Sequence, residues 1–287
     1  MASSENEHVE ETEAARKAAE VAVELSETGQ PPDRRRLIRA LRSVSRSAGY
    51  AVGRGAGIGA NLARRGASTA RRGAGTASRG AASLLNWLTA QVIAMGPRLR
   101  IRDQAMLRAQ FPGRSDEEIA ELLIDRAARA ATAVGGATGA WAALPTLPAF
   151  PAEVAAETLA VVGIELKLVA ELHEAYGVPA PGNAAERARS YLASWAHRRG
   201  VFMVPGGLLL VTGSPLARQL RRRLAARVRR STFSLSPLFT GAFAGAVLNR
   251  RETRKLGRDI VDDLKKSARP IVRGEAISGP PITDPRD

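Results

Sequence analysis

The sequence predicts an all-α protein: a helical bundle with Gly/Ala-rich apolar helices, plus a flexible N-terminal arm and C-terminal tail. Two observations lead to this prediction. Signals that start and stop helices recur along the chain, and apolar residues lie three or four apart between them. No run of alternating apolar and polar residues, which is typical of a half-buried strand, occurs in the sequence. The predicted segments are an acidic disordered arm (1–33), an Arg/Ala/Gly-rich repeat segment (34–80), a helical domain (81–268) and a disordered tail (269–287).

Charge is unevenly distributed over the first third of the chain. Residues 1–33 hold nine acids and two bases, whereas residues 34–102 hold fifteen arginines and no acid. The acidic segment has few large apolar residues and ends at Gln-Pro-Pro, so we expect it to be mostly disordered. The basic segment is expected to attract polyanions. Arginine outnumbers lysine 38 to 5, however, as a GC-rich genome would also produce without any partner.

The basic segment contains a seven-residue repeat, which reads ANLARRG, ASTARRG and AGTASRG from residue 60 onward. Seven residues nearly complete two helical turns, so a helix here would align five arginines along one stripe. These are Arg64, Arg65, Arg71, Arg72 and Arg79. The opposite face holds only small residues, so we expect a frayed or unfolded segment in water. Docking on a polyanion and a flexible linker without a partner remain alternative roles.

The helical domain carries clear boundary signals. Ser115 followed by Glu118 forms a capping box, which predicts a helix that closes near residues 135–136. A proline at 151 and the Tyr-Gly step at 176–177 bound a long helix, and Asn183 starts another that ends before Gly200. This part of the chain is therefore predicted to be helical throughout.

Four uncharged runs approach the ~20 residues that a membrane span requires: 80–97, 130–152, 200–217 and 231–249. Proline and glycine interrupt most of them, and alanine replaces the strongly apolar residues that favour hydrocarbon. We therefore favour buried helices or half-inserted hairpins over true spans. Spacings such as Gly135/Gly139 allow helices to approach closely in either setting.

Two basic clusters lie in the second half of the chain. The run RQLRRRLAARVRR (218–230) reads as a basic amphipathic helix that includes Arg221, Arg222 and Arg223. In GAFAGAVLNRRETRKLGRDI (241–260), a small apolar stretch leads directly into Arg250, Arg251, Arg254 and Lys255. These bases mark either a return to water beside anionic headgroups or an ordinary solvated helix face.

Residues 131–179, ATAVGGATGAWAALPTLPAFPAEVAAETLAVVGIELKLVAELHEAYGVP, resemble the EcsC protein family. The shared pattern is a Gly-rich segment, a proline-punctuated turn and a long helix that ends in Ala-Tyr-Gly. The later GAFAGAVLNRRETRKLG resembles the family's closing element, so the resemblance spans about 115–268. The resemblance implies a helical bacterial protein for which no activity is established. It also implies a membrane-proximal role, because the gene for which the family is named neighbours an ABC-type transporter.

No constellation of catalytic residues is apparent. The chain has no cysteine, and its three histidines are far apart in sequence. Glu165, Glu171 and Glu174 are interpreted as a solvated acidic helix face. The GAGIGA string at 55–60 lacks the preceding strand of a dinucleotide site. We therefore expect no enzymatic activity, no cofactor and no metal.

These observations favour a cytoplasmic protein at the inner face of the cell membrane, bound peripherally to anionic lipid through its basic segments. The acidic N-terminus lacks the features of a secretory signal. Nucleic-acid binding by the basic N-terminal block is an alternative, although no aromatic residues interleave with the arginines to stack on bases. A scaffold that binds an unknown protein partner is the other alternative.

Overall fold

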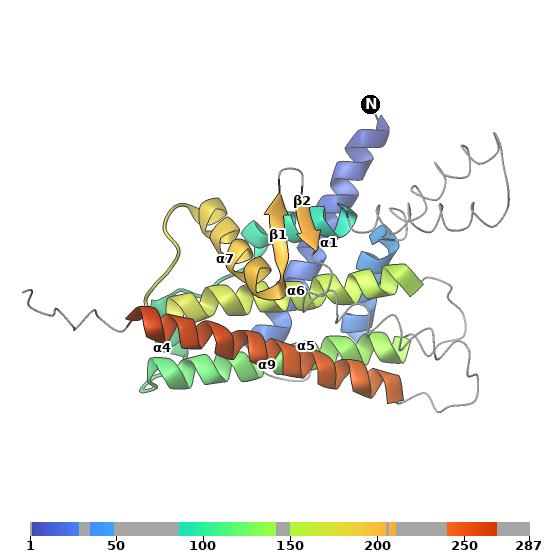
Figure 1. Ribbon diagram of the computed structural model, residues 1–287. Helices are drawn as coiled ribbons and strands as arrows, with labels where there is room; N and C mark the ends of the chain where they lie inside the picture. The colour runs from blue at the N-terminus through green and yellow to red at the C-terminus, as the bar shows by residue number, and fades with distance from the viewer. Residues whose placement is uncertain are drawn as a thin grey trace, which may run out of the picture.

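The computed structural model describes residues 2–28, 35–48, 86–141, 150–204, 207–210 and 240–268. The predicted repeats (60–80), the basic run (218–230) and the predicted tail (269–287) lie outside these residues. Within them, the prediction of a helical bundle is confirmed. Three long helices, α5 (Asp116–Trp141), α6 (Phe150–Ala175) and α9 (Thr240–Ala268), lie side by side (Figure 1).

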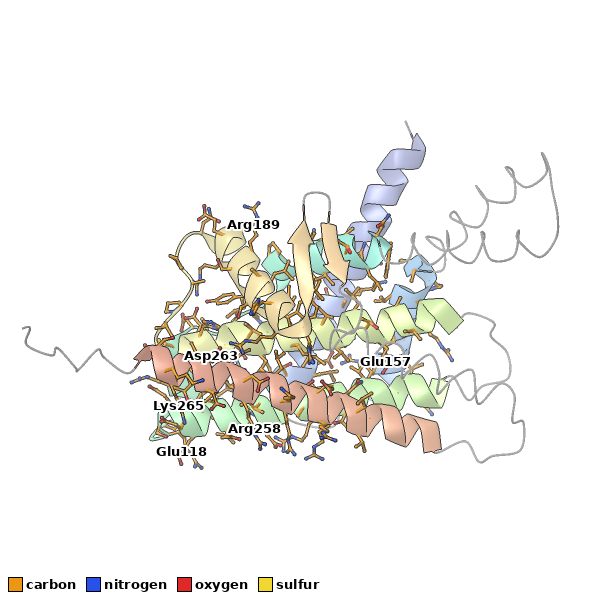
Figure 2. All side chains as sticks on the ribbon, in the orientation of Figure 1. Glu118, Glu157, Arg189, Arg258, Asp263 and Lys265 are labelled. Atoms are coloured by element: carbon orange, nitrogen blue, oxygen red, sulfur yellow. The ribbon has the colours of Figure 1, made fainter. Side chains whose placement is uncertain are left out.

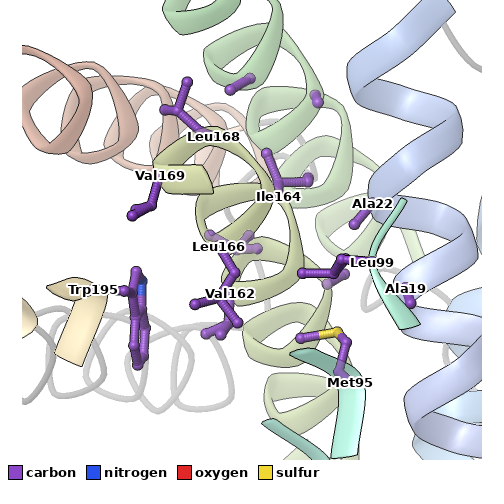
Figure 3. Close-up of a cluster of buried hydrophobic side chains, with 14 of the residues drawn as sticks. Ala19, Ala22, Met95, Leu99, Val162, Ile164, Leu166, Leu168, Val169 and Trp195 are labelled. Carbon is purple, nitrogen blue, oxygen red and sulfur yellow. The ribbon is translucent and has the colours of Figure 1, made fainter. Parts of the chain in front are cut away.

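Helix α6 is the centre of the bundle. From Val154 to Ala175 every side chain is buried except that of His173, which is half-buried. In Figure 3 Trp195 packs on one side of α6, and Ala19 and Ala22 lie on the other side beside Met95. A helix surrounded in this way needs an apolar or internally paired side chain at every position.

The predicted helix boundaries are largely confirmed. The Oγ of Ser115 accepts a hydrogen bond from the backbone N–H of Glu118 at 3.2 Å, and α7 (Ala184–Arg199) has a complete capping box at Asn183. Gly200 ends α7 with φ 63°, a conformation that favours glycine. The predicted end of the preceding helix near residues 135–136 was wrong, because α5 continues to Trp141. Glycines stay inside a helix where a neighbouring chain comes too close for a side chain.

The acidic arm is not disordered over residues 2–28. These residues form helix α1 (Ala2–Thr28), which packs against α6 and α5. Its buried stripe consists mainly of alanine: Ala14, Ala15, Ala18, Ala19, Val21, Ala22 and Leu25. The prediction relied on the lack of large apolar residues. Alanine is sufficient here because a Cβ on Gly163 of α6 would lie only 3.0 Å from the Cβ of Ala22, so the helices lie in close contact.

Residues 35–48 also form a helix, so the expectation of a frayed or unfolded segment in water was wrong for this part of 34–80. Leu37, Leu41 and Val44 are buried in the core. The Nζ of Lys17 in α1 donates a hydrogen bond to the Oγ of Ser43 at 2.7 Å, which places this helix against α1. The apolar residues that fold it precede the small-residue repeats.

Short elements complete the described structure. A helix at 86–95 leads into the 3₁₀ turn η1 (Gly96–Arg98), which is followed by α4 (Gln104–Gln110). After α7, strands β1 (Val201–Val204) and β2 (Gly207–Leu210) form an antiparallel hairpin that was not predicted. Its strands VFMV and GLLL are uniformly apolar, so alternation could not indicate them. None of the described helices is both long enough and apolar enough to cross a membrane.

Candidate functional site

Four of the twelve predicted contact residues lie in the described part of the chain, and all four are in α9. Arg250, Arg251 and Lys255 are exposed, and Arg254 is half-buried. The other eight lie outside the described residues. These are Arg64, Arg65, Arg71, Arg72, Arg79, Arg221, Arg222 and Arg223. The candidate site whose contacts the structure describes therefore lies on α9, on the face that carries these four residues.

Helix α9 has two opposite faces. Its buried face contains Asn249, Thr253, Leu256 and Ile260, spaced four, three and four residues apart. The bases occupy the other face, within an arc of about 140° at 100° per residue. We call Arg250, Arg251, Arg254, Lys255 and Arg258 the basic stripe. Figure 2 shows Arg258 on the side of α9 that faces away from α6.

Two fully buried polar side chains fix the rotation of α9. The Nδ2 of Asn249 donates to the carbonyl oxygen of Ala131 and to the Oε1 of Glu157, both at 3.3 Å. The Oγ1 of Thr253 donates to the Oε1 of Glu165 at 3.1 Å. Rotating α9 about its axis would break these hydrogen bonds inside the bundle. Each buried polar group left without its partner costs about 1–3 kcal/mol. The basic stripe therefore has to face outward.

Close contact between α5 and α9 depends on glycine. A Cβ added to Gly257 would lie 2.5 Å from the Cγ1 of Ile124, and one added to Gly135 would lie 2.8 Å from the Nδ2 of Asn249. These distances are too short for any side chain, so the two helices can approach closely only with glycine at these positions.

We expect Gly257→Ala to lower the free energy of unfolding by about 1–3 kcal/mol, because Ile124 is β-branched and has few alternative rotamers. Gly136→Ala is the matched control, since nothing lies within 4 Å of the added Cβ. The control should be neutral or stabilising by up to about 1 kcal/mol through helix propensity. Urea denaturation of both variants measures the difference, and equal stabilities would contradict the close packing.

One carboxylate is surrounded by part of the basic stripe. Asp125 of α5 pairs with Arg254, and its Oδ2 lies 2.7 Å from the Nη1 of Arg129. The hydrogen bond from Arg254 lowers the pKa of Asp125 from its ordinary value of 3.8, and the charges of Arg129, Arg254 and Arg250 lower it further against the effect of partial burial. Asp125 therefore stays ionised and holds Arg254 in place while bases remain in excess around it.

The rest of the stripe is open to solvent. Lys255 pairs with Asp259 at 2.9 Å, one turn further along α9. Arg250, Arg251 and Arg258 are exposed, and Val247 at the start of the stripe is 49% exposed. Guanidinium groups bind phosphate oxygens through two hydrogen bonds at once, so this surface is suited to phosphate-bearing partners.

The interpretation of Glu165, Glu171 and Glu174 as a solvated acidic face was wrong. All three are buried, and each is paired with an arginine. Glu165 pairs with Arg199 of α7 and also accepts a hydrogen bond from the Nε1 of Trp195 at 3.0 Å. A helix that is covered on every side has no face left for solvent.

Glu171 holds two cations. Its Oε2 lies 2.6 Å from the Nη2 of Arg102, and its Oε1 lies 2.5 Å from the Nζ of Lys167, which is fully buried. Lys167 also contacts Glu27 of α1 at 3.2 Å. Burial alone would lower the pKa of Arg102, but the hydrogen bond and charge of Glu171 raise it above its ordinary value.

These buried clusters join elements of the fold. Glu165 and Arg199 connect α6 with α7 and α9, and Glu171 connects α6 with the chain before α4. Their carboxylate oxygens are satisfied within the protein, and the side chains are almost wholly shielded from solvent. Among the described residues, no group of three histidines and carboxylates could hold a metal ion.

Sequence reasoning missed the pairing of these clusters. The arginine partners of Glu171 and Glu165 lie 69 and 34 residues away in the sequence. Nothing in the local pattern indicates such distant partners. Two signals were available: both carboxylates occur in a strongly apolar helix, where an unpaired charge would be costly, and Lys167 stands four residues before Glu171.

No model of a known protein family, no curated protein and no solved structure matches this chain.

Proposed function

We propose that this chain is a non-enzymatic helical protein that docks peripherally on anionic membranes through the basic stripe of α9. The observation that carries this proposal is the outward orientation of five bases on one helix face, opposite the buried Asn249 and Thr253. The orientation is built into the core, so the bases are presented together to any partner that approaches this side.

The energetics favour a lipid surface as the partner. A base near an anionic membrane contributes about 1 kcal/mol, so several bases in one plane give a useful affinity from electrostatics alone. Exposed Val247 adds a small apolar contact at the start of the stripe. The arginines of the repeats and of the run 218–230, which lie outside the described residues, are further candidates for the same surface.

The cellular location follows from the same chemistry. Anionic lipids give the cytoplasmic leaflet a negative surface potential, so we place the protein at the inner face of the cell membrane. The resemblance of residues 115–268 to the EcsC family supports a bacterial, membrane-proximal protein. It indicates no reaction, and the clusters of charged side chains described above already have structural roles.

The test is co-sedimentation with vesicles, using a variant of the stripe. We expect Arg250→Gln, Arg251→Gln and Arg258→Gln together to weaken binding to phosphatidylglycerol vesicles by about tenfold or more, at about 1 kcal/mol per base. Arg254 is left unchanged because it is paired with Asp125.

The matched control removes three exposed bases that lie outside the basic stripe. Arg108→Gln, Arg114→Gln and Lys266→Gln give the same net charge but leave the stripe intact. This control should bind nearly as well as the wild type. If both variants lose vesicle binding equally, the net charge of the protein explains the binding. That result would contradict a defined docking surface. A DNA gel shift that depends on the stripe, without vesicle binding, would favour nucleic acid instead.

A further inference from the structure

One carboxylate joins the basic stripe of α9 to a further base, Arg129 of α5. The Oδ2 of Asp125 lies 2.7 Å from the Nη1 of Arg129, and its Oδ1 accepts a hydrogen bond from the Nη2 of Arg254. The two guanidinium groups therefore contact different oxygens of a single carboxylate. Neither side chain is enclosed, because 52% of Arg129 and 35% of Arg254 remain exposed.

The packing of α5 against α9 fixes which residues of the two helices are level with one another. The helices lie side by side in Figure 1. Gly257 of α9 packs against Ile124 of α5, and Ala246, which comes earlier in α9, packs against Gly135, which comes later in α5. The two helices are therefore antiparallel, and their register is set by a contact on each side of Arg129.

Interpolation between these two contacts places Arg129 level with the turn of α9 that runs from Arg250 to Arg254. These two arginines are four residues apart, so they point in directions that differ by about 40°. The charge of Arg250 also acts on Asp125, together with those of Arg129 and Arg254. We call Arg129, Arg250 and Arg254 the arginine cluster.

The arginine cluster carries more charge than its carboxylate neutralises. Three guanidinium groups and the one carboxylate of Asp125 leave a net charge of +2. Glu252 lies in the same turn of α9 but pairs with Arg199 of α7, away from the cluster. A guanidinium group has five N–H donors, and Asp125 engages one nitrogen each of Arg129 and Arg254. Donors therefore remain for a second anion.

We infer that the arginine cluster binds a phosphomonoester carried by a lipid headgroup, so that docking favours lipids with a terminal phosphate over phosphodiester lipids. This inference rests on the proposed docking through the basic stripe, because the bilayer has to meet that face. A phosphomonoester carries about −1.5 to −2 charges near pH 7 and offers three acceptor oxygens. A phosphodiester carries one charge and has two unesterified oxygens. The charge and the three guanidinium groups of the cluster match the phosphomonoester.

The test compares binding of the full chain to two kinds of vesicle by co-sedimentation. One contains phosphatidic acid and the other phosphatidylglycerol, and both are adjusted to the same zeta potential in phosphatidylcholine. We expect the wild type to bind the phosphatidic acid vesicles about fivefold more tightly or better, through additional charge-assisted hydrogen bonds. Arg129→Gln should reduce this preference to about twofold or less. It leaves the basic stripe intact, so binding to phosphatidylglycerol should continue.

Arg114→Gln is the matched control, because Arg114 is also about half exposed and also pairs with a carboxylate four residues away, that of Glu118. This variant should keep the preference, and circular dichroism verifies that both variants retain their helices. Inorganic phosphate at the concentration of the accessible lipid phosphate should not release the wild type from the vesicles.

Each other outcome gives a definite answer. Wild-type binding to both vesicles without a preference would overturn the inference and leave the proposed function standing. Absence of binding to either vesicle would overturn both. A preference that persists in Arg129→Gln, or that is lost equally in Arg114→Gln, would overturn the arginine cluster as the site. Release by inorganic phosphate would identify a site for free phosphate and overturn the assignment to a headgroup.

Discussion

Replacing Arg199 with methionine is expected to lower the free energy of unfolding by about 3–5 kcal/mol. The guanidinium group of Arg199 pairs with the Glu165 carboxylate, and its Nη1 lies 3.3 Å from Glu252 of α9. Without it, the buried Glu165 loses its cationic partner. Methionine fills much of the same volume, so the loss of stability measures the effect of removing the charge rather than that of creating a cavity. Urea denaturation followed by tryptophan fluorescence measures it.

Arg189→Met is the matched control, because Arg189 lies in the same helix and is exposed (Figure 2). Its effect should stay within about 0.5 kcal/mol, as for most surface substitutions. Adding Glu165→Gln to the Arg199 variant should recover part of the lost stability, since the amide removes the unpaired charge. If the Arg199 variant is as stable as the control, the buried ion pair does not hold α7 and α9 to α6.

The second large effect is expected for Glu171→Ala, which leaves Arg102 and Lys167 as neighbouring buried cations. We predict a loss of about 3–5 kcal/mol in the free energy of unfolding. Removal of the carboxylate also deletes the acceptor of two hydrogen bonds, which the Nε–H of Arg102 donates at 2.8 Å and its backbone N–H donates at 3.2 Å. Chemical denaturation followed by circular dichroism provides the measurement.

Glu121→Ala serves as the comparison, since Glu121 is exposed on α5 and its removal should have little effect. Replacing Lys167 with methionine in the Glu171 variant removes one of the two cations that have lost this carboxylate. This double variant should be more stable than Glu171→Ala alone. A loss below about 1 kcal/mol for Glu171→Ala would mean that water reaches this cluster and solvates its charges.

The sequence was sufficient to predict the helices with strong local signals. Ser115 and Asn183 form the expected caps, and Gly200 ends its helix as expected. Local signals failed to predict helices whose existence or length depends on packing against distant segments. Ala22 of α1 fits against Gly163, and Gly135 lies inside α5 where Asn249 and Ala246 leave no room for a side chain. Complementarity of this kind between distant segments is not visible in either segment alone.

The candidate site was also only partly predictable from the sequence. The bases at 250–255 were recognised from their density, and the structure places them on one helix face. Their orientation depends on Asn249 and Thr253, whose partners lie in α5 and α6. The helix at 35–48 was overlooked although Leu37, Leu41 and Val44 lie four and three residues apart, because the prediction for this segment relied on the small-residue repeats that follow it.

The most direct test of the central claim is co-sedimentation of the wild-type chain with phosphatidylglycerol and phosphatidylcholine vesicles at low and high salt. We predict strong sedimentation with the acidic vesicles at low salt, little with the neutral ones, and release as salt screens the charges. Equal sedimentation with both vesicles, or none with either, would contradict electrostatic docking through the basic stripe.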